Sequence, residues 1–200
     1  MKHIVMNTCP ESLSITALVI IGGIRMTPEE ISWMGLFLEE VKDHIDVFLM
    51  PSSDSERSRL FPLKPYSDLF FPRVSEEVGL CSNPQLFEGE NGVQIVATCG
   101  ENVKDFLNNC DWASSELEAM EMMVLSGHYC PTSPFSLKTE PFGEDYLVME
   151  KLPHVMVSGK GRAWGSKRVK VDQGEVTLVS IPERKMALVG LDGTFARELL

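Results

Sequence analysis

The most constraining feature of this sequence is an unbroken apolar run near its start, because a matching strand follows it closely. Residues 15–21 read ITALVII, and Gly22 stops the run. Such a run without polar alternation is typical of a strand that is covered on both faces, as in a parallel sheet. A second apolar strand is expected at 46–50, closed by turn formers at 51–54. Two strands with a helix between them predict a right-handed βαβ unit and an α/β fold.

The helix between these strands has a clear N-terminal signal. Thr27 and Glu30 have the spacing of a capping box, and Pro28 suits the first helical position. Apolar residues then recur at steps of three and four, at Ile31, Met34, Leu38, Val41 and Ile45. One face of this helix is therefore expected to pack against the sheet.

The middle of the chain contains an irregular segment and then new helix and strand signals. Prolines and loop formers predict a long irregular excursion over 55–92, held to the core by the aromatic piece at 69–71. A strand is expected at 93–99 and a short helix at 101–109. Ser115 and Glu118 form a second capping box, with inward residues expected at Leu117, Met120, Met123 and Val124. The methionines of this helix are interpreted as core filling rather than as an adaptable binding surface.

The last part of the chain is rich in strand signals. A buried strand is expected at 154–159, ending on glycine. Shorter strands, separated by turn residues at 172–174 and 182–184, are expected at 169–171, 175–181 and 185–191. These turns favour antiparallel hairpins.

Composition limits both the organisation and the partners of the chain. Its 200 residues, of which 44% are hydrophobic, can bury one core, and residues 1–200 are expected to form a single domain. The formal net charge of -11 opposes direct binding to a phosphate backbone. A basic cluster within 160–170 is interpreted as a solvated turn between strands rather than as a phosphate site.

Cysteine usage and hydropathy indicate the cellular environment that is expected for this protein. The five cysteines are irregularly spaced and contain no CxxC pair, which indicates a reduced intracellular protein with cysteines in its core. The longest apolar run, residues 17–21, is too short to cross a membrane, so no membrane partner is expected.

Residues 126–161 form the stretch where a functional loop is most expected, because a strand there ends on glycine. A two-metal phosphoesterase site would need carboxylates, an Asn and histidines at successive strand ends. The expected strand ends instead hold glycines, serines and cations, at 22–23, 51–54 and 158–162. Only Asp54 and His128 are plausible ligands, and Lys160 and Arg162 would repel a dication. We expect no catalytic residue, no metal site and no cofactor.

His128 has two interpretations. It is either a leftover metal ligand or a core histidine that hydrogen-bonds within the turn at 130–134. The second is favoured, because a neutral imidazole can satisfy both ring nitrogens locally. His154, at the start of a strand, is interpreted as structural.

Several segments, in their order along the chain, resemble one family. They are DVFLMPSSD (46–54), LFPLKPYSDLFFP (60–72), LCSNPQLFEGENGVQIVATCGENVKDF (80–106), SGHYCPTSP (126–134), LPHVMVSGKGRAWGSK (152–167) and VTLVSIPERKMALVGL (176–191). Together they resemble the phosphoesterase-like region of the small (B) subunits of the replicative DNA polymerases alpha, delta and epsilon, and the delta branch of this family most of all.

This resemblance implies a calcineurin-like metallophosphoesterase fold, an α+β sandwich, with a degenerate site. The vestigial positions would be Gly23, Ser53, Asp54, His128, Lys160 and Arg162. It implies a non-catalytic scaffold in DNA replication, located in the nucleus. Such a subunit bridges the C-terminal domain of the polymerase catalytic subunit to a further accessory subunit and meets DNA only indirectly. A residual metal-dependent phosphodiesterase or nuclease is the alternative.

The resemblance also carries an expectation about the N-terminus. Family members have an oligonucleotide/oligosaccharide-binding domain and a first phosphoesterase strand before the region matched here. Both are expected to be absent from this chain, which would make it N-terminally truncated relative to the family.

Overall fold

The structure is a computed structural model, in which the chain divides into two compact units. The N-terminal unit falls within residues 1–58 and 64–82, and the C-terminal unit within 59–63 and 83–200. The residues that the structure describes are 15–22, 27–54, 60–74, 76–89, 92–140, 143–190 and 196–198. None of the helices in these ranges is long and apolar enough to cross a membrane.

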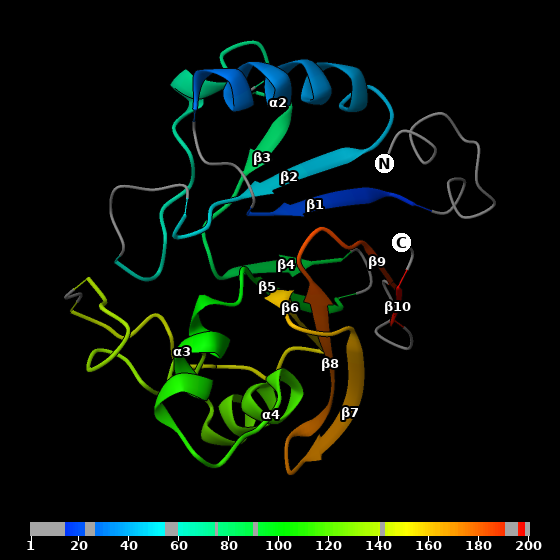
Figure 1. The fold of residues 1–200 in the computed structure, drawn as a ribbon. Coiled ribbons are helices and arrows are strands. Elements are labelled where there is room, and N and C mark those ends of the chain that lie inside the picture. Colours follow the sequence, from blue (N-terminus) through cyan, green and yellow to red (C-terminus); the bar gives the residue numbers. More distant parts are fainter. Residues whose placement is uncertain are drawn as a thin grey trace. The chain divides into compact units, whose positions relative to one another are not determined.

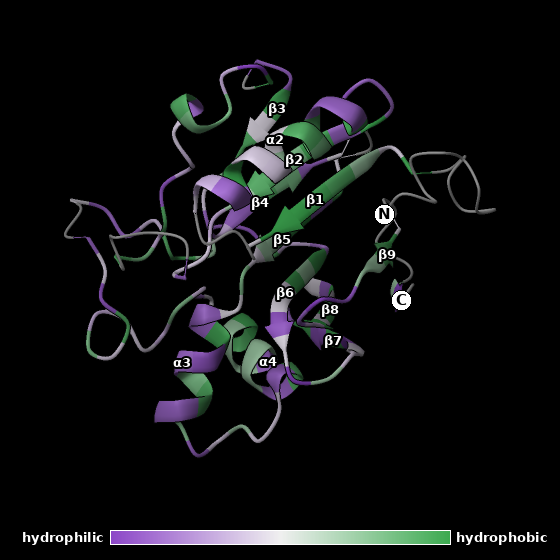
Figure 2. Cartoon of the chain, turned by 45° about the horizontal axis from the view of Figure 1, so that its top comes forward, coloured by the Kyte–Doolittle hydropathy of each residue, from purple (hydrophilic) through white to green (hydrophobic). Residues whose placement is uncertain are grey.

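The N-terminal unit contains the expected βαβ arrangement (Figure 1). Strands β1 (Ala17–Ile21), β2 (Asp46–Met50) and β3 (Val78–Leu80) form a parallel sheet in that order. Helix α2 (Pro28–Val41) lies along one face of this sheet. Figure 2 shows the hydrophobic colouring of β1, which follows from its apolar sequence. The prediction of a parallel strand–helix–strand unit is confirmed.

Helix α2 is held by its cap and its apolar face. The Thr27 side chain accepts a hydrogen bond from the Glu30 backbone N–H at 3.3 Å. Met34, Leu38 and Val41 are buried in the core of this unit. The helix ends at Val41, so the prediction that Ile45 continues its apolar face is wrong. Ile45 lies beyond the helix and packs, partly buried, at the edge of the same core.

The C-terminal unit is built on a mixed sheet (Figure 1). Its strands, in spatial order, are β4 (Gln85–Glu88), β5 (Gln94–Thr98), β6 (Val155–Gly161), β8 (Gly174–Pro182) and β7 (Gly165–Val171). The three central strands are parallel, and the two edge strands β4 and β7 run antiparallel to their neighbours. The sequence therefore folds as mixed α/β.

Helices α3 (Glu101–Asn109) and α4 (Glu116–Ser126) supply the apolar core of this unit. Figure 2 shows hydrophilic and hydrophobic stretches on α3, whose Val103 and Phe106 are buried. Met120 and Met123 of α4 are fully buried in one cluster with Met156 of β6. The interpretation of these methionines as core filling is confirmed.

Of two sequence predictions about the irregular region, the one of an excursion without strands is wrong, and the one of an aromatic anchor is confirmed for Phe71 alone. The excursion at 55–92 contains strands β3 and β4 and a 3-10 turn, η2 (Asp68–Phe70). Within the aromatic piece only Phe71 is buried, whereas Leu69 and Phe70 are 82% and 43% exposed.

The last hairpin also differs from the prediction. Strand β9 (Ala187–Val189) pairs with β10 (Ala196–Glu198) instead of β8. The hairpin between β7 and β8, in contrast, is antiparallel as predicted. The turn at 172–174 joins strands that are neighbours, while the turn at 182–184 leads the chain out of the sheet.

Candidate functional site

The carboxyl ends of the parallel strands β5, β6 and β8 form the candidate site, since ligands of α/β sheets bind at such ends. Thr98, Ser158 and Ser180 lie next to one another there, because Thr98 pairs in register with Ser158 and Ser158 with Ser180. All three are buried, with at most 1% exposed. A row of hydroxyl groups therefore crosses the sheet where a catalytic site would be expected.

Each hydroxyl of this row has a partner inside the protein. Thr98 donates to Asn102 Oδ1 at 2.8 Å. Ser158 donates to the Gly159 carbonyl at 3.3 Å, and Ser180 to the Ala163 carbonyl at 3.2 Å. The hydroxyl groups at these strand ends thus bind acceptors in α3, in β6 and in the turn between β6 and β7, because a buried donor without an acceptor would be costly.

Asn83 and Asn102 extend this row into a buried amide network. Asn83 Oδ1 accepts from the Cys99 backbone N–H at 3.2 Å, and its Nδ2 donates to Glu101 Oε2 at 3.0 Å. Asn102 Nδ2 donates to the Tyr129 carbonyl at 2.7 Å. Both asparagines are fully buried. The network ties the start of β4, the end of β5, the first turn of α3 and the loop after α4 to one another.

Asp105 of α3 holds the loop that follows α4. Its Oδ2 accepts a hydrogen bond from Thr132 Oγ1 and another from Ser136 Oγ. A carboxylate that accepts from two hydroxyls makes strong charge-assisted bonds. Its neighbour in the helix, Asn102, binds the same loop through Tyr129. Two residues of one helix turn therefore fix a loop that is distant in the sequence. Asp105 and Thr132, for example, are 27 residues apart.

Neighbouring segments of the chain also pack closely against the backbone at the strand ends. Gly100 has a φ of +90°, and a Cβ at this position would collide with the Gly159 carbonyl oxygen. A Cβ at Gly161 would collide with Ser180 Oγ. Glycine is needed at Gly100 because a backbone oxygen lies where a side chain would begin and φ is positive, whereas at Gly161 the Ser180 side chain would have to move.

His128 makes a contact through each of its ring nitrogens. Its Nδ1 accepts from the Cys130 backbone N–H at 2.9 Å, and its Nε2 lies 3.1 Å from Asp145 Oδ2. The bond with His128, together with one from the Leu147 backbone N–H, lowers the pKa of the Asp145 carboxyl. The contact with Cys130 is the local one that the sequence favours, whereas Asp145, the partner of Nε2, lies 17 residues along the chain and outside the turn at 130–134. His154 is similar, since its Nδ1 accepts from the Gln94 backbone N–H at 2.9 Å.

Lys160 and Arg162 lie at the end of β6, where they continue the strand into a turn. Lys160 has a φ of +52°, and the Arg162 backbone N–H donates to Glu116 Oε1 at 2.9 Å. Glu116 is the first residue of α4, whereas His128 follows its last residue. At about 1.5 Å per residue, α4 is roughly 16 Å long, so Arg162 and His128 lie toward opposite ends of this helix. The structure does not bring these predicted positions together.

The remaining predicted positions belong to the other unit. Ser53 and Asp54 follow β2, and Asp54 is exposed. Gly23 lies outside the described residues. Within the ranges that the structure describes, no three His, Cys, Asp or Glu side chains form a group that could hold a metal ion.

Two buried cysteines have thiols of low reactivity. Burial raises the pKa of the Cys130 thiol to about 11, and it also raises that of Cys81, in the N-terminal unit, to about 11. A thiol with so high a pKa carries almost no thiolate at neutral pH and is a poor nucleophile.

A separate depression of about 430 Å³ lies between the C-terminal end of α4 and the turn that joins β7 to β8. Leu125, Leu152 and Lys170 are among its lining residues. It does not involve the strand-end hydroxyls or the predicted positions.

Comparison with known proteins assigns the family. Residues 25–163 match the family model that describes the B subunit of DNA polymerase alpha/epsilon. The chain belongs to this family. The buried asparagines, Asp105 and His128 all lie within the matched span.

Individual relatives are polymerase delta small subunits. The chain is 28% identical to the DNA polymerase delta small subunit of Arabidopsis thaliana over 159 residues, which is 78% of this chain and 36% of the relative. It is 27% identical to the DNA polymerase delta subunit 2 of Drosophila melanogaster over 156 residues, 74% of this chain and 36% of that relative. The Saccharomyces cerevisiae small subunit is 24% identical over 179 residues, 74% of this chain and 37% of that relative. The chain thus spans little more than a third of the length of these relatives.

Sequence reasoning about this member of the family missed the buried network. It singled out charged and histidine side chains as candidate ligands and did not assign a role to Asn83, Thr98 or Asn102. The signal available in the sequence was the pairing of small polar residues with strand ends, at Thr98, Ser158 and Ser180.

Proposed function

We propose that this chain acts as a non-catalytic accessory subunit of the replicative DNA polymerase delta complex. In this role it works in DNA replication, in the nucleus, by bridging the catalytic subunit to other subunits. The observation that carries the proposal is the similarity to polymerase delta small subunits from a plant, an insect and a yeast, over 74% to 78% of the chain.

For the fold, we propose a degenerate calcineurin-like phosphoesterase domain comprising residues 1–200. A mixed sheet with helices α3 and α4 packed beside it is compatible with that architecture. The sealed strand ends support the degenerate character, because neutral hydroxyls bonded to backbone carbonyls take the place where metal ligands would be needed.

The chemistry of the vestigial positions also supports a scaffold. Lys160 and Arg162 bring positive charge to the end of β6, which opposes a bound dication. His128 is engaged with Cys130 and Asp145. These residues serve the local structure, and we assign no catalytic role, metal or cofactor to them.

The proposed partners are the C-terminal domain of the catalytic subunit and a further accessory subunit. The net charge of -11 supports contacts with proteins rather than with DNA, since a negative field repels a phosphate backbone. DNA would be reached only through the assembled complex.

The test is association with the C-terminal domain of the polymerase delta catalytic subunit. The purified chain is mixed with this domain at micromolar concentration, and the complex is measured by size-exclusion chromatography with light scattering. A full-length polymerase delta small subunit is the positive control. A stable complex with both is expected, and a complex with the control alone would refute the proposal for this chain.

A second measurement addresses the non-catalytic assignment. The chain is incubated with Mn²⁺ and a chromogenic phosphodiester, and hydrolysis is compared with that of a Lys160→Ala/Arg162→Ala variant. No turnover is expected from either protein. Turnover that needs Mn²⁺ would overturn the assignment.

A further inference from the structure

The outward face of helix α2 carries large apolar side chains that its own core does not use. Trp33 is 63% exposed and Leu36 is 61% exposed. The Trp33 ring stacks on Phe37, with centroids 5.9 Å apart and planes inclined by 8°. The exposed Trp33 and Leu36, together with the half-buried Phe37 that packs against the core, thus form an apolar surface on one face of the helix, which is typical of an interaction site.

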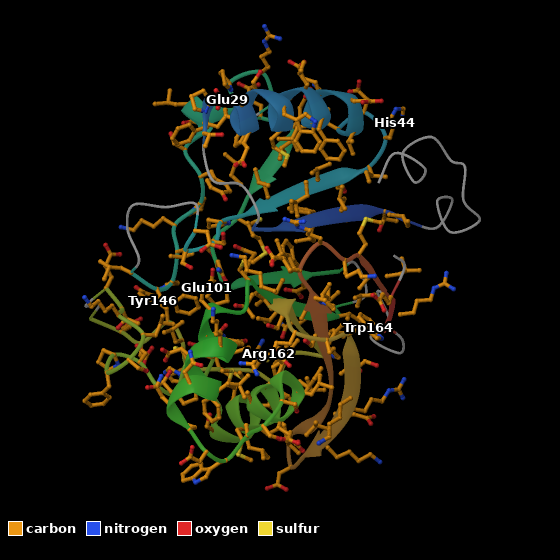
Figure 3. The ribbon with its side chains drawn as sticks, viewed as in Figure 1. Glu29, His44, Glu101, Tyr146, Arg162 and Trp164 are labelled. Atoms are coloured by element: carbon orange, nitrogen blue, oxygen red, sulfur yellow. The ribbon has the colours of Figure 1, made fainter. Side chains whose placement is uncertain are left out.

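Acidic residues frame this surface at both ends of the helix. Glu29 and Glu30 precede Trp33, and Glu39 and Glu40 follow Phe37. Helix α2 itself contains no Lys or Arg. Figure 2 accordingly shows α2 as hydrophilic at its two ends and more hydrophobic between them, and Figure 3 marks its surroundings with Glu29 and His44.

Two described basic residues near α2 are paired with acidic side chains, Arg73 with Glu39 on the helix and Lys42 with Glu77 outside it. Arg73 Nη1 lies 3.4 Å from Glu39 Oε1. Glutamates 29 and 40 and the aspartate at position 43 are all exposed. The field around the exposed apolar residues is therefore negative, and it favours a cationic partner.

We propose that the outward face of α2 binds an amphipathic helix of a protein partner, with an apolar stripe flanked by Lys and Arg. The apolar stripe covers Trp33, Leu36 and Phe37, and the flanking cations meet the glutamates at the ends of α2. A cation of the partner also gains from the exposed indole face of Trp33. The 14 residues of α2 extend over about 21 Å, which matches three to four turns of a partner helix.

This inference goes beyond the proposed function, because it fixes a surface and the chemistry of its partner. It does not require the partner to be the catalytic subunit. The association test described above can therefore fail while this one succeeds, and the reverse also holds.

The probe is a synthetic helical peptide of about 18 residues with a leucine stripe and lysines elsewhere, labelled for fluorescence anisotropy. A second peptide has the same leucines with glutamates in place of the lysines. The full chain is expected to bind the Leu/Lys peptide and not the Leu/Glu peptide. Binding is expected to weaken as salt is added, because the contributing charges are exposed.

Two variants of the chain locate the binding. Trp33→Ala/Leu36→Ala removes the apolar surface and is expected to weaken binding of the Leu/Lys peptide at least about tenfold. Trp112→Ala is the matched control, because Trp112 is 83% exposed and follows Asp111 in the other unit. It is expected to leave the affinity unchanged. Circular dichroism and thermal unfolding establish that both variants fold.

A third variant tests the charge requirement without touching the apolar residues. Glu29→Lys/Glu40→Lys is expected to weaken binding of the Leu/Lys peptide and to create binding of the Leu/Glu peptide. Failure of this reversal would overturn the proposed recognition by charge.

Other outcomes would also overturn the proposal. An equal loss in the Trp112→Ala variant would mean that the peptide binds exposed tryptophans in general and not the surface of α2. Equal binding of the two peptides to the wild-type chain would mean that the surface recognises apolar side chains of any charge. A dimer in light scattering that the Trp33→Ala/Leu36→Ala variant abolishes would make the surface a contact between two copies of this chain.

Discussion

The buried polar network of the C-terminal unit and the exposed apolar side chains of helix α2 in the N-terminal unit show two opposite uses of side chains. The C-terminal unit buries Asn83, Thr98 and Asn102 completely and satisfies them with partners of its own. The N-terminal unit leaves Trp33 and Leu36 exposed on α2. Buried hydrogen-bonded polar groups specify a local conformation, whereas exposed apolar groups are available to another molecule. The contrast separates residues that hold the fold from residues that can bind.

The sharpest way to break this contrast is to remove one member of the buried network. Asn102→Ala leaves the Tyr129 carbonyl without its donor and Thr98 without its nearer acceptor. We expect the free energy of unfolding to fall by about 3 kcal/mol, because buried polar groups lose their partners. Urea unfolding followed by tryptophan fluorescence measures this loss. A Trp33→Phe background is used because the remaining Trp112 and Trp164 both lie in the C-terminal unit.

Asn108→Ala is the matched control for this substitution. Asn108 is an exposed asparagine on the same helix. Its replacement is expected to change stability by less than about 0.5 kcal/mol. Similar losses from both substitutions would mean that α3, and not the network, determines the effect.

A smaller effect is expected where the network reaches the loop after α4. Asp105→Ala removes the acceptor of Thr132 and Ser136, and we expect a loss of about 2 kcal/mol. Hydrogen exchange should accelerate in residues 131–136 and remain unchanged in β6. Asp111→Ala, at an exposed position nearby, should change neither quantity.

The N-caps of α2 and α4 allow the two units to be compared through the same type of hydrogen bond. Thr27 caps α2 and Ser115 caps α4, each by accepting a backbone N–H at 3.3 Å. Thr27→Ala and Ser115→Ala are each expected to cost about 1 kcal/mol. Thermal unfolding measures both by tryptophan fluorescence. A Trp112→Phe/Trp164→Phe background reports on the N-terminal unit through Trp33, and the Trp33→Phe background reports on the C-terminal unit through the other two tryptophans. An unequal cost would show that the two units differ in how strongly tertiary packing supports their helices.

The smallest expected effect is on the pH dependence of stability at acidic pH. The pKa of Asp145 is lowered by its bonds with His128 and the Leu147 N–H, so its charged form stabilises the native state. That stability is present above the ordinary aspartate pKa of about 3.9 and is lost as pH falls through the lower native value. Asp145→Asn should therefore make unfolding less dependent on pH below about pH 4. An unchanged pH dependence in urea titrations would contradict this.

Local signals in the sequence predicted the elements whose stabilising contacts are local. The capping residues Thr27 and Ser115 and the apolar spacing of α2 and α4 were sufficient, because caps and helix faces involve residues within four positions. The parallel strands β1 and β2 were also predicted, since each is an unbroken apolar run. The same reasoning extended α2 too far, because Ile45 continues the apolar spacing after the backbone has left the helix.

Features that depend on distant residues could not be predicted in this way. Strand β4 is half exposed and only four residues long, so its sequence has little periodic signal before it pairs with β5. Strand β9 follows a turn signal, but its partner is β10. The network has the same origin: Asn83 meets Thr98 only because β4 and β5 lie antiparallel. For the site, the sequence predicted the contact of His128 with Cys130, but neither its contact with Asp145 nor the hydrogen bonds at the strand ends.

The position of β7 at the margin of its sheet gives the basic cluster of residues 160–170 a different meaning. This strand has one paired edge, against β8, and Lys167, Arg168 and Lys170 are exposed along it. An open strand edge invites another chain to add a strand, and natural proteins deter this with lysines and arginines. The positive charges along β7 are of the kind that deters such strand addition, a task that needs no ligand.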